Sequence, residues 1–128
     1  MKLLDSTFLI DLLRGRKETL KIINSKEMLL TTQINIYEVV KGLFLKNIPS
    51  SKFAKIMEMF ENIRVLPFDD NAVIQSAEIY TRLVKKGLEV HNFDCMIAGA
   101  ALSRGVNTII TKNTRHFERI NGMKVEKY

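Results

Sequence analysis

Residues 91–110 read HNFDCMIAGAALSRGVNTII, and this stretch decides the class of fold. Its pattern predicts a helix over 93–104 that is apolar on almost every side and is ended by Gly105, followed by a short apolar strand over 107–110. A helix with so little polar surface has almost no face left for water. We therefore expect it to lie buried against a sheet, with one carboxylate, Asp94, at its beginning.

Short apolar segments alternate with helical segments along the rest of the chain. Strands are expected at 2–5, 28–32, 63–68, 107–110 and 123–126, and helices at 6–13, 18–24, 34–46, 50–60, 70–86 and 93–104, with a further short helix before the last strand. This alternation favours a parallel sheet with helices on both faces, and strands that are apolar throughout are typical of a sheet buried on both faces. We expect a single domain over residues 1–128 with an α/β fold: a three-layer α/β/α sandwich around a central, mainly parallel sheet of four to five strands.

Composition limits the class of protein. The one cysteine, Cys95, excludes an internal disulfide framework and a cysteine zinc site, and it fits a reducing cytoplasm. Neither a signal peptide nor a membrane-spanning apolar run is apparent, so we expect a cytoplasmic protein with no membrane partner. A net charge of +6 favours an anionic partner, nucleic acid first, and a solvated basic surface is the alternative.

Three acidic residues fall where the expected strands end. Asp5 follows the first strand, Glu38 lies early in the helix after the second, and Asp94 heads the apolar helix before the fourth. The carboxyl ends of parallel strands share one edge of a sheet, so we expect these side chains to converge there. Neighbouring carboxylates raise one another's pKa, and a divalent cation such as Mg²⁺ relieves that repulsion.

Each of these acids also has a purely local explanation. Asp5 can accept backbone N–H groups of the following helix, and Asp94 can interact with the helix dipole. Glu38 can form a surface ion pair with Lys41. Only their joint placement favours a site over these alternatives.

Other polar residues give weaker indications. His91 and His116 are the only histidines and lie far apart in the sequence, so we expect surface or loop positions rather than a zinc site. Asp11 is expected to face solvent. No GxGxxG or GxxxxGK[ST] motif follows any strand, which argues against a nucleotide-binding protein of the Rossmann or P-loop class.

Four segments, taken in order, resemble one known family. They are LLDSTFLIDLLRG (3–15), INIYEVVKG (34–42), NFDCMIAGAAL (92–102) and TIITKNTRHFERI (108–120). Together they resemble a PIN-domain ribonuclease, and within that family a VapC toxin of a VapBC toxin–antitoxin pair. The resemblance implies a PIN-like sandwich and a metal-dependent endoribonuclease that uses Mg²⁺ or Mn²⁺, with one ion expected and a second left open.

The resemblance also implies roles for individual residues. Asp5, Glu38 and Asp94 match the three principal acids of the family, as catalytic residues and metal ligands. Asn113 stands where a fourth acid is usual and could bind metal through a water, and His116 stands where many relatives carry an acid. Further candidates are hydroxyl or amide groups beside the acids, which would orient them or contact phosphate, and basic residues that would contact the RNA backbone. The first group is Ser6, Thr111 and Asn113, and the second is Arg14, Lys112 and Arg115.

The implied partners are an RNA substrate, a cognate VapB-like antitoxin and a second copy of the chain. An apolar face for a partner is expected on the helices within residues 8–13 and 36–60. Because Asn113 adds no charge, the alternative is a catalytically weak or inactive PIN-fold module that binds RNA or a partner protein.

Overall fold

The computed structural model describes residues 1–89 and 91–128. Its strands are β1 (Lys2–Leu4), β2 (Leu29–Thr32), β3 (Arg64–Leu66), β4 (Thr108–Ile110) and β5 (Lys124–Glu126). Its helices are α1 (Ser6–Leu13), α2 (Lys17–Ile23), α3 (Gln33–Leu45), α4 (Ser50–Glu61), α5 (Asp70–Lys85), α6 (Asn92–Leu102) and α7 (Thr114–Glu118). All five strands are parallel and form one sheet in the order β3-β2-β1-β4-β5. The α/β prediction and the order of its elements are confirmed.

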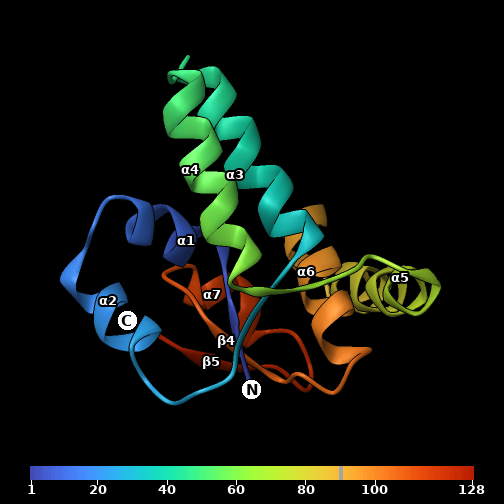
Figure 1. Cartoon of the computed structure of the whole chain (residues 1–128). Coiled ribbons are helices and arrows are strands. Elements are labelled where there is room, and N and C mark those ends of the chain that lie inside the picture. Colours follow the sequence, from blue (N-terminus) through green and yellow to red (C-terminus); the bar gives the residue numbers. More distant parts are fainter. Residues whose placement is uncertain (90) are drawn as a thin grey trace.

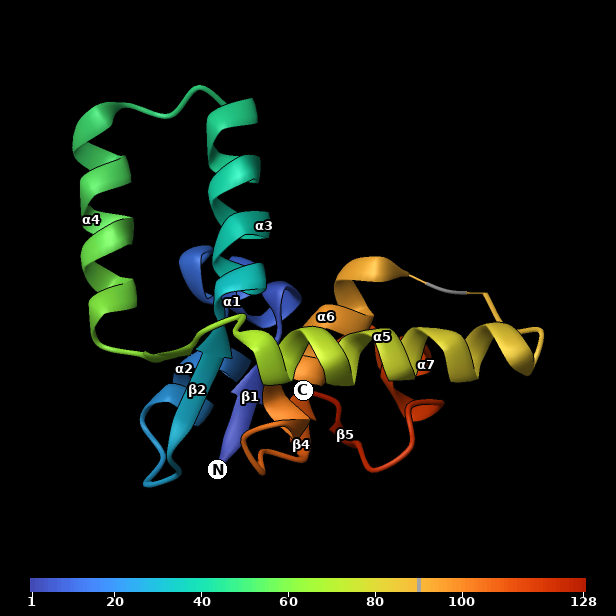
Figure 2. The same ribbon diagram turned by 90° about the vertical axis from the view of Figure 1, so that its right-hand side faces the viewer.

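Helices cover both faces of the sheet (Figures 1 and 2). Because successive side chains of a strand point to opposite faces, Leu3 and Leu4 of β1 enter different cores. Leu3 and Ile109 pack with residues of α5, α6 and α7. Leu4 and Ile110 pack with residues of α1, α3 and α4. The strands are therefore buried on both faces, as their apolar sequences predict.

Helix α6 is the buried helix predicted from residues 93–104. Cys95 and all residues from Ile97 to Ala101 are buried. Its small residues let α5 come very close, since a Cβ built on Gly99 would lie 2.0 Å from Ser76 Oγ and 2.7 Å from the Ser76 backbone nitrogen. The close approach of α5 and α6 fixes the position of Asp94, in the first turn of α6.

Most element ends differ from the sequence expectation by one or two residues, and two of these differences lie in elements that adjoin or carry a candidate acid. Strand β1 ends at Leu4, because Asp5, although its backbone is still extended, serves as the N-cap residue of α1. Helix α6 ends at Leu102 rather than at residue 104, and Gly105 then turns the chain with a φ of 76°. Asp5 thus belongs to the β1–α1 junction, where its carboxylate faces the edge of the sheet rather than one of its cores.

Helices α3 and α4 form a hairpin that projects beyond the rest of the fold (Figure 2). Phe44 and Phe53 stack between the two helices with a centroid distance of 5.2 Å. Tyr37, Phe44 and Leu45 remain exposed on α3. An apolar face therefore exists within residues 36–60, as predicted, but the one expected over residues 8–13 does not, because Phe8 and Leu9 are buried in the core.

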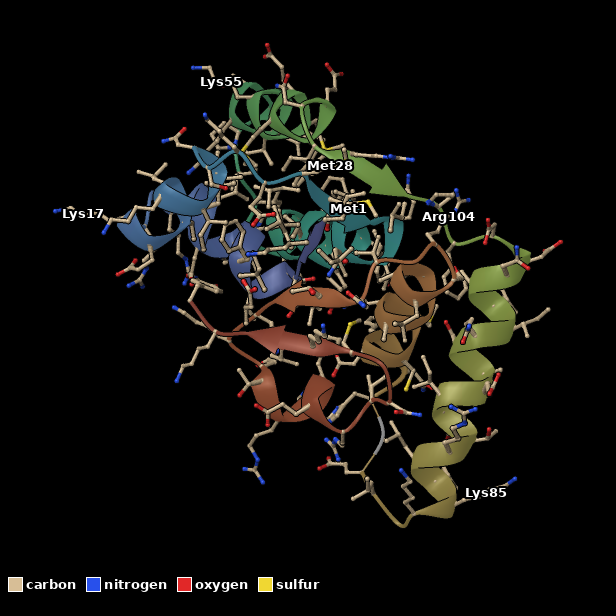
Figure 3. All side chains as sticks on the ribbon, turned by 90° about the horizontal axis from the view of Figure 1, so that it is seen from below. Met1, Lys17, Met28, Lys55, Lys85 and Arg104 are labelled. Atoms are coloured by element: carbon tan, nitrogen blue, oxygen red, sulfur yellow. The ribbon has the colours of Figure 1, made fainter. Side chains whose placement is uncertain are left out.

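The edge of the sheet at which the strands begin lies opposite the edge at which they end. Viewed from there, Met1 and Met28 lie close together, while Lys17, Lys55 and Lys85 extend outward from the periphery (Figure 3). These lysines of α2, α4 and α5 are exposed to solvent. No helix in the described ranges is both long and apolar enough to cross a bilayer.

Candidate active site

The carboxylate of Asp5 lies at the edge where β1 and β4 end, and it is the most enclosed of the three candidate acids. Its residue is only 3% exposed. Asn35 Nδ2 donates to Asp5 Oδ1 over 3.2 Å, and Thr111 Oγ1 donates to Asp5 Oδ2 over 2.6 Å. Thr7 Oγ1 adds a longer hydrogen bond of 3.4 Å. Both carboxylate oxygens are therefore fixed by donors that come from the junctions following β1, β2 and β4.

Asn35 links Asp5 to Glu38. Thr32 and Asn35 form a capping box at the beginning of α3, which holds the Asn35 side chain in place. Asn35 Nδ2 also donates to Ser6 Oγ over 2.9 Å, and Ser6 Oγ donates to Glu38 Oε1 over 2.7 Å. Buried Asn35 therefore organises two acids, a role that the sequence analysis missed. One feature of the sequence could have indicated this role: in INIYE, the Asn35 amide stands between two isoleucines, one helical turn before Glu38.

Asp94 approaches the same edge from the first turn of α6. Its side chain is 17% exposed, and its Oδ2 lies 2.8 Å from His116 Nδ1. The His116 ring stacks on His91, with a centroid distance of 4.2 Å and an interplanar angle of 16°. Both histidines are partly exposed, as expected, but the inference that their distance in sequence keeps them apart is wrong. Their 25-residue separation carries no periodic signal, because only the tertiary fold brings α7 beside α6.

Burial raises the pKa of each of the three acids. The charge of Asp94 adds to the effect of burial on the pKa of Asp5, and hydrogen bonds from Thr111 and Asn35 oppose it. The charges of Asp5 and Asp94 both help burial to raise the pKa of Glu38. For Asp94, burial is the main cause of the raised pKa, and His116 opposes it. The structure thus brings Asp94 near enough to Asp5, and both of them near enough to Glu38, to disfavour the charged forms of Asp5 and Glu38.

This donor set fits a divalent cation. Within the described residues, Glu38 Oε2 and Asp94 Oδ1 accept no hydrogen bond from a protein donor, so carboxylate oxygens remain for an ion. Hard cations such as Mg²⁺ and Mn²⁺ prefer oxygen ligands of this kind. A bound cation would also offset the cost of burying these charges and the repulsion that Asp5 and Glu38 experience from neighbouring acids.

Asn113 and Thr111 follow β4 in different ways. Thr111 is buried and holds Asp5, whereas Asn113 is exposed. The Asn113 backbone N–H donates to Thr111 Oγ1 over 2.9 Å, and in the described part of the chain its side chain makes no hydrogen bond. Asn113 therefore contributes to the site through its backbone in this structure.

The candidate RNA-contacting residues divide into two groups. Arg14 and Arg115 are exposed, and Arg115 lines a hollow with Glu89, His116 and Arg119. Lys112 is different, because its Nζ lies 2.7 Å from Asp11 Oδ2.

Asp11 is not solvent-facing, and that expectation is wrong. The residue is only 5% exposed and also accepts a 2.9 Å hydrogen bond from the Tyr128 hydroxyl. The hydrogen bond from Lys112 is the main reason why the pKa of Asp11 is lowered. Asp11 thereby ties α1 to the loop after β4 and to residue 128.

A parallel sheet with three carboxylates gathered where its strands end defines the class of protein. The PIN domain family model matches residues 2–123, and the chain belongs to this family. Within it, the chain belongs with the VapC toxins. The tRNA(fMet)-specific endonuclease VapC of Shigella flexneri is 35% identical over 97 residues, which cover 76% of this chain and 73% of that protein.

Two further comparisons agree with this assignment. The tRNA(fMet)-specific endonuclease VapC of Salmonella typhimurium is 33% identical over 106 residues, covering 83% of this chain and 79% of that protein. The crystal structure of DNA-bound VapBC from Salmonella typhimurium matches with a TM-score of 0.86 at 29% identity, covering 98% of this chain and 96% of that chain. The PIN-like fold and the VapC resemblance predicted from the four sequence segments are confirmed.

Proposed function

We propose that this chain is a single-domain, metal-dependent endoribonuclease and the toxin of a VapBC-type pair. The observation that carries the proposal is the convergence of Asp5, Glu38 and Asp94 at one edge of the sheet. Burial raises the pKa of all three acids, and the charge of Asp94 adds to the raised pKa values of Asp5 and Glu38. A structural role alone would not favour three carboxylates there, because buried acids without a cation are costly. The family membership and the names of the relatives support the same activity.

Asp5, Glu38 and Asp94 would hold Mg²⁺ or Mn²⁺. When bound, such an ion stabilises negative charge on a phosphate and lowers the pKa of a water molecule. Asn35 and Thr111 hold the Asp5 carboxylate in one orientation, and Ser6 does the same for Glu38. These hydrogen bonds preorganise the site, so that little reorganisation is needed when substrate binds.

Glu38 is the acid best placed to move a proton. It is half-buried, its Oε1 is held by Ser6, and Oε2 is left to accept a proton from an attacking water. The products would be a 5′-phosphate and a 3′-hydroxyl, as the family resemblance implies.

RNA is the proposed substrate, and transfer RNA is the first to test because two relatives are named tRNA(fMet)-specific endonucleases. Arg14 and Arg115 are exposed and would contact phosphates, contributing affinity that falls with salt. Lys112 would contribute less, since Asp11 already neutralises its charge.

A VapB-like antitoxin is the proposed protein partner. The exposed apolar face of α3 includes Tyr37, Phe44 and Leu45, with side chains of Val40 and Lys41 beside them. Exposed apolar surface of this kind marks interaction sites. A second copy of the chain is proposed to pack on α5, where Val73, Ile74 and Val84 are exposed.

An inactive binding module remains the alternative, and exposed Asn113 in place of an acid is the observation that favours it. One assay separates the two functions. The purified chain, freed of any antitoxin, is incubated with initiator tRNA in Mg²⁺, in Mn²⁺ and in EDTA. We expect cleavage only with metal, and a loss of about 100-fold or more in Asp5→Asn and in Asp94→Asn. Asp70→Asn, at an exposed position in the first turn of α5, is the matched control and should cleave normally. Cleavage that survives EDTA or both site substitutions would rule out the metal mechanism, and binding without cleavage would favour the module.

A further inference from the structure

We propose that His91, Asp94 and His116 form a second metal site, for a borderline transition-metal ion such as Zn²⁺, on the α6–α7 side of the carboxylate cluster. Each of the three offers a ligand atom, and these atoms all lie within 4.8 Å of one another. Two imidazoles and one carboxylate form a set of three protein ligands that zinc sites with an open fourth position use. The three-acid site does not account for this pair of histidines, one of which stands where many relatives carry an acid.

The geometry is close to what Zn²⁺ requires. Bonds of about 2.0–2.2 Å in a tetrahedral site place ligand atoms about 3.3–3.6 Å apart. Asp94 Oδ2 and His116 Nδ1 are already 2.8 Å apart, and the His91 ring lies parallel to the His116 ring at 4.2 Å. Small rotations of half-exposed rings are enough to bring all three ligand atoms to one ion. His91 and His116 side chains are 40% and 34% exposed, so an ion has access.

Asp94 joins this site to the carboxylate cluster without merging the two. Its Oδ2 faces His116, whereas its Oδ1 accepts no protein hydrogen bond among the described residues. Each oxygen can therefore serve one ion, as a shared carboxylate does in two-metal sites. The imidazoles select the metal, because nitrogen ligands favour Zn²⁺, Co²⁺ or Ni²⁺ over Mg²⁺.

Charged residues near the histidines both oppose and favour the binding of a cation. Arg115 and Arg119 line the hollow beside His116 and oppose a bound cation. Glu89 lines the same hollow, and its Oε1 lies 3.7 Å from His91 Nε2, so its carboxylate offsets part of that charge. An ordinary Asp94–His116 hydrogen bond, with His91 merely stacked, is the competing interpretation that an experiment must separate.

The composition of the chain makes the test direct. It contains only two histidines, so every imidazole signal of the untagged protein comes from this site. We suggest titrating Zn²⁺ into the chain and following the imidazole nitrogen resonances by NMR and the affinity by calorimetry. The titration is repeated in Asp5→Asn, which weakens the carboxylate cluster but leaves both histidines, and with Mg²⁺ in place of Zn²⁺.

We expect Zn²⁺, but not Mg²⁺, to shift the signals of both imidazoles, in the wild-type chain and in Asp5→Asn. His91→Gln and His116→Gln should each lower the Zn²⁺ affinity by about 10-fold or more, since even groups that only orient a ligand are worth that much. Cys95→Ala should bind normally, because the thiol is buried. Imidazole signals that do not move in saturating Zn²⁺ would overturn the site. An unchanged affinity in the double variant of His91 and His116, folded by circular dichroism, would overturn it too. Neither result depends on RNA cleavage, so the nuclease proposal succeeds or fails separately.

Discussion

We predict that Gly99→Ala, at the contact between α5 and α6, strongly lowers the stability of the fold. A methyl group at position 99 would lie 2.0 Å from Ser76 Oγ, 2.7 Å from its backbone nitrogen and 2.8 Å from its Cα. The hydroxyl can rotate away, but the two backbone atoms cannot. Helices α5 and α6 would have to separate by several tenths of an ångström or more, in a core that is otherwise closely packed.

Gly99→Ala should lower the free energy of unfolding by about 3 kcal/mol, the upper end of the range for overpacked cores. A chain of 128 residues has an unfolding entropy of about 0.27 kcal/mol/K. The predicted fall in Tm is therefore about 10 °C. Asp94 lies five residues earlier on the same helix, about 7.5 Å along its axis, so a displaced α6 should also weaken RNA cleavage at temperatures where the variant is folded.

The assay is thermal unfolding followed by circular dichroism, with Gly42→Ala as the matched control. Gly42 also lies within a helix, α3, but a Cβ there would meet nothing within 4 Å. That substitution should stabilise the chain by about 0.5–1 kcal/mol, because alanine loses less backbone entropy than glycine on folding. Adding Ser76→Ala to Gly99→Ala should restore only part of the loss, since the backbone contacts remain. The reasoning is refuted if the Tm of Gly99→Ala stays near that of the wild type, or if both glycine substitutions shift Tm in the same direction.

Three further predictions concern charged groups. Glu38→Gln should raise Tm in EDTA at neutral pH. Burial and neighbouring acids raise the folded-state pKa of Glu38. The contribution of Glu38 to stability is therefore present at low pH and is lost as pH rises through that pKa. The same substitution should leave Tm unchanged near pH 3, where the group is protonated in both states. Asp11→Asn should lower Tm at pH 7, because Lys112 lowers the folded-state pKa of Asp11. The contribution of Asp11 to stability is present above its unfolded-state pKa and disappears as pH falls through its folded-state pKa. Thermal unfolding at a series of pH values checks this, and equal destabilisation at every pH would contradict it. Mn²⁺ should raise the Tm of the wild type by binding only the folded state, and should do so less for Asp5→Asn; equal shifts would place the ion elsewhere.

The sequence was informative about the position of a side chain wherever that position follows from the order of strands and helices. Asp5, Glu38 and Asp94 each follow or precede a recognisable element, so a parallel sheet alone predicts that they meet at one edge. Their meeting is visible in their effects on one another's pKa. Contacts between residues that are distant in sequence left no comparable pattern in the sequence.

Asn35 and the histidines illustrate that limit. In the sequence, Asn35 is one of several polar residues of its helix, yet its amide links Asp5 to Ser6 and hence to Glu38. His116 and His91 have no periodic relation, and only the packing of α7 against the N-terminal end of α6 stacks their rings. Contacts of this kind depend on how helices cross, and sequence spacing does not encode that crossing.

By itself, the sequence determined the layers of this protein, because short strands apolar on both faces and amphipathic helices have few ways to bury their surfaces. It also determined which acids lie at the carboxyl edge of the sheet, through the order of strands and helices. Only the tertiary structure decided which groups hold those acids, that Asp11 is buried against Lys112, and that two histidines join Asp94. The physical reason is range: hydrophobic periodicity acts within one element, whereas hydrogen bonds and ligand sets need atoms placed to within a few tenths of an ångström by packing between elements.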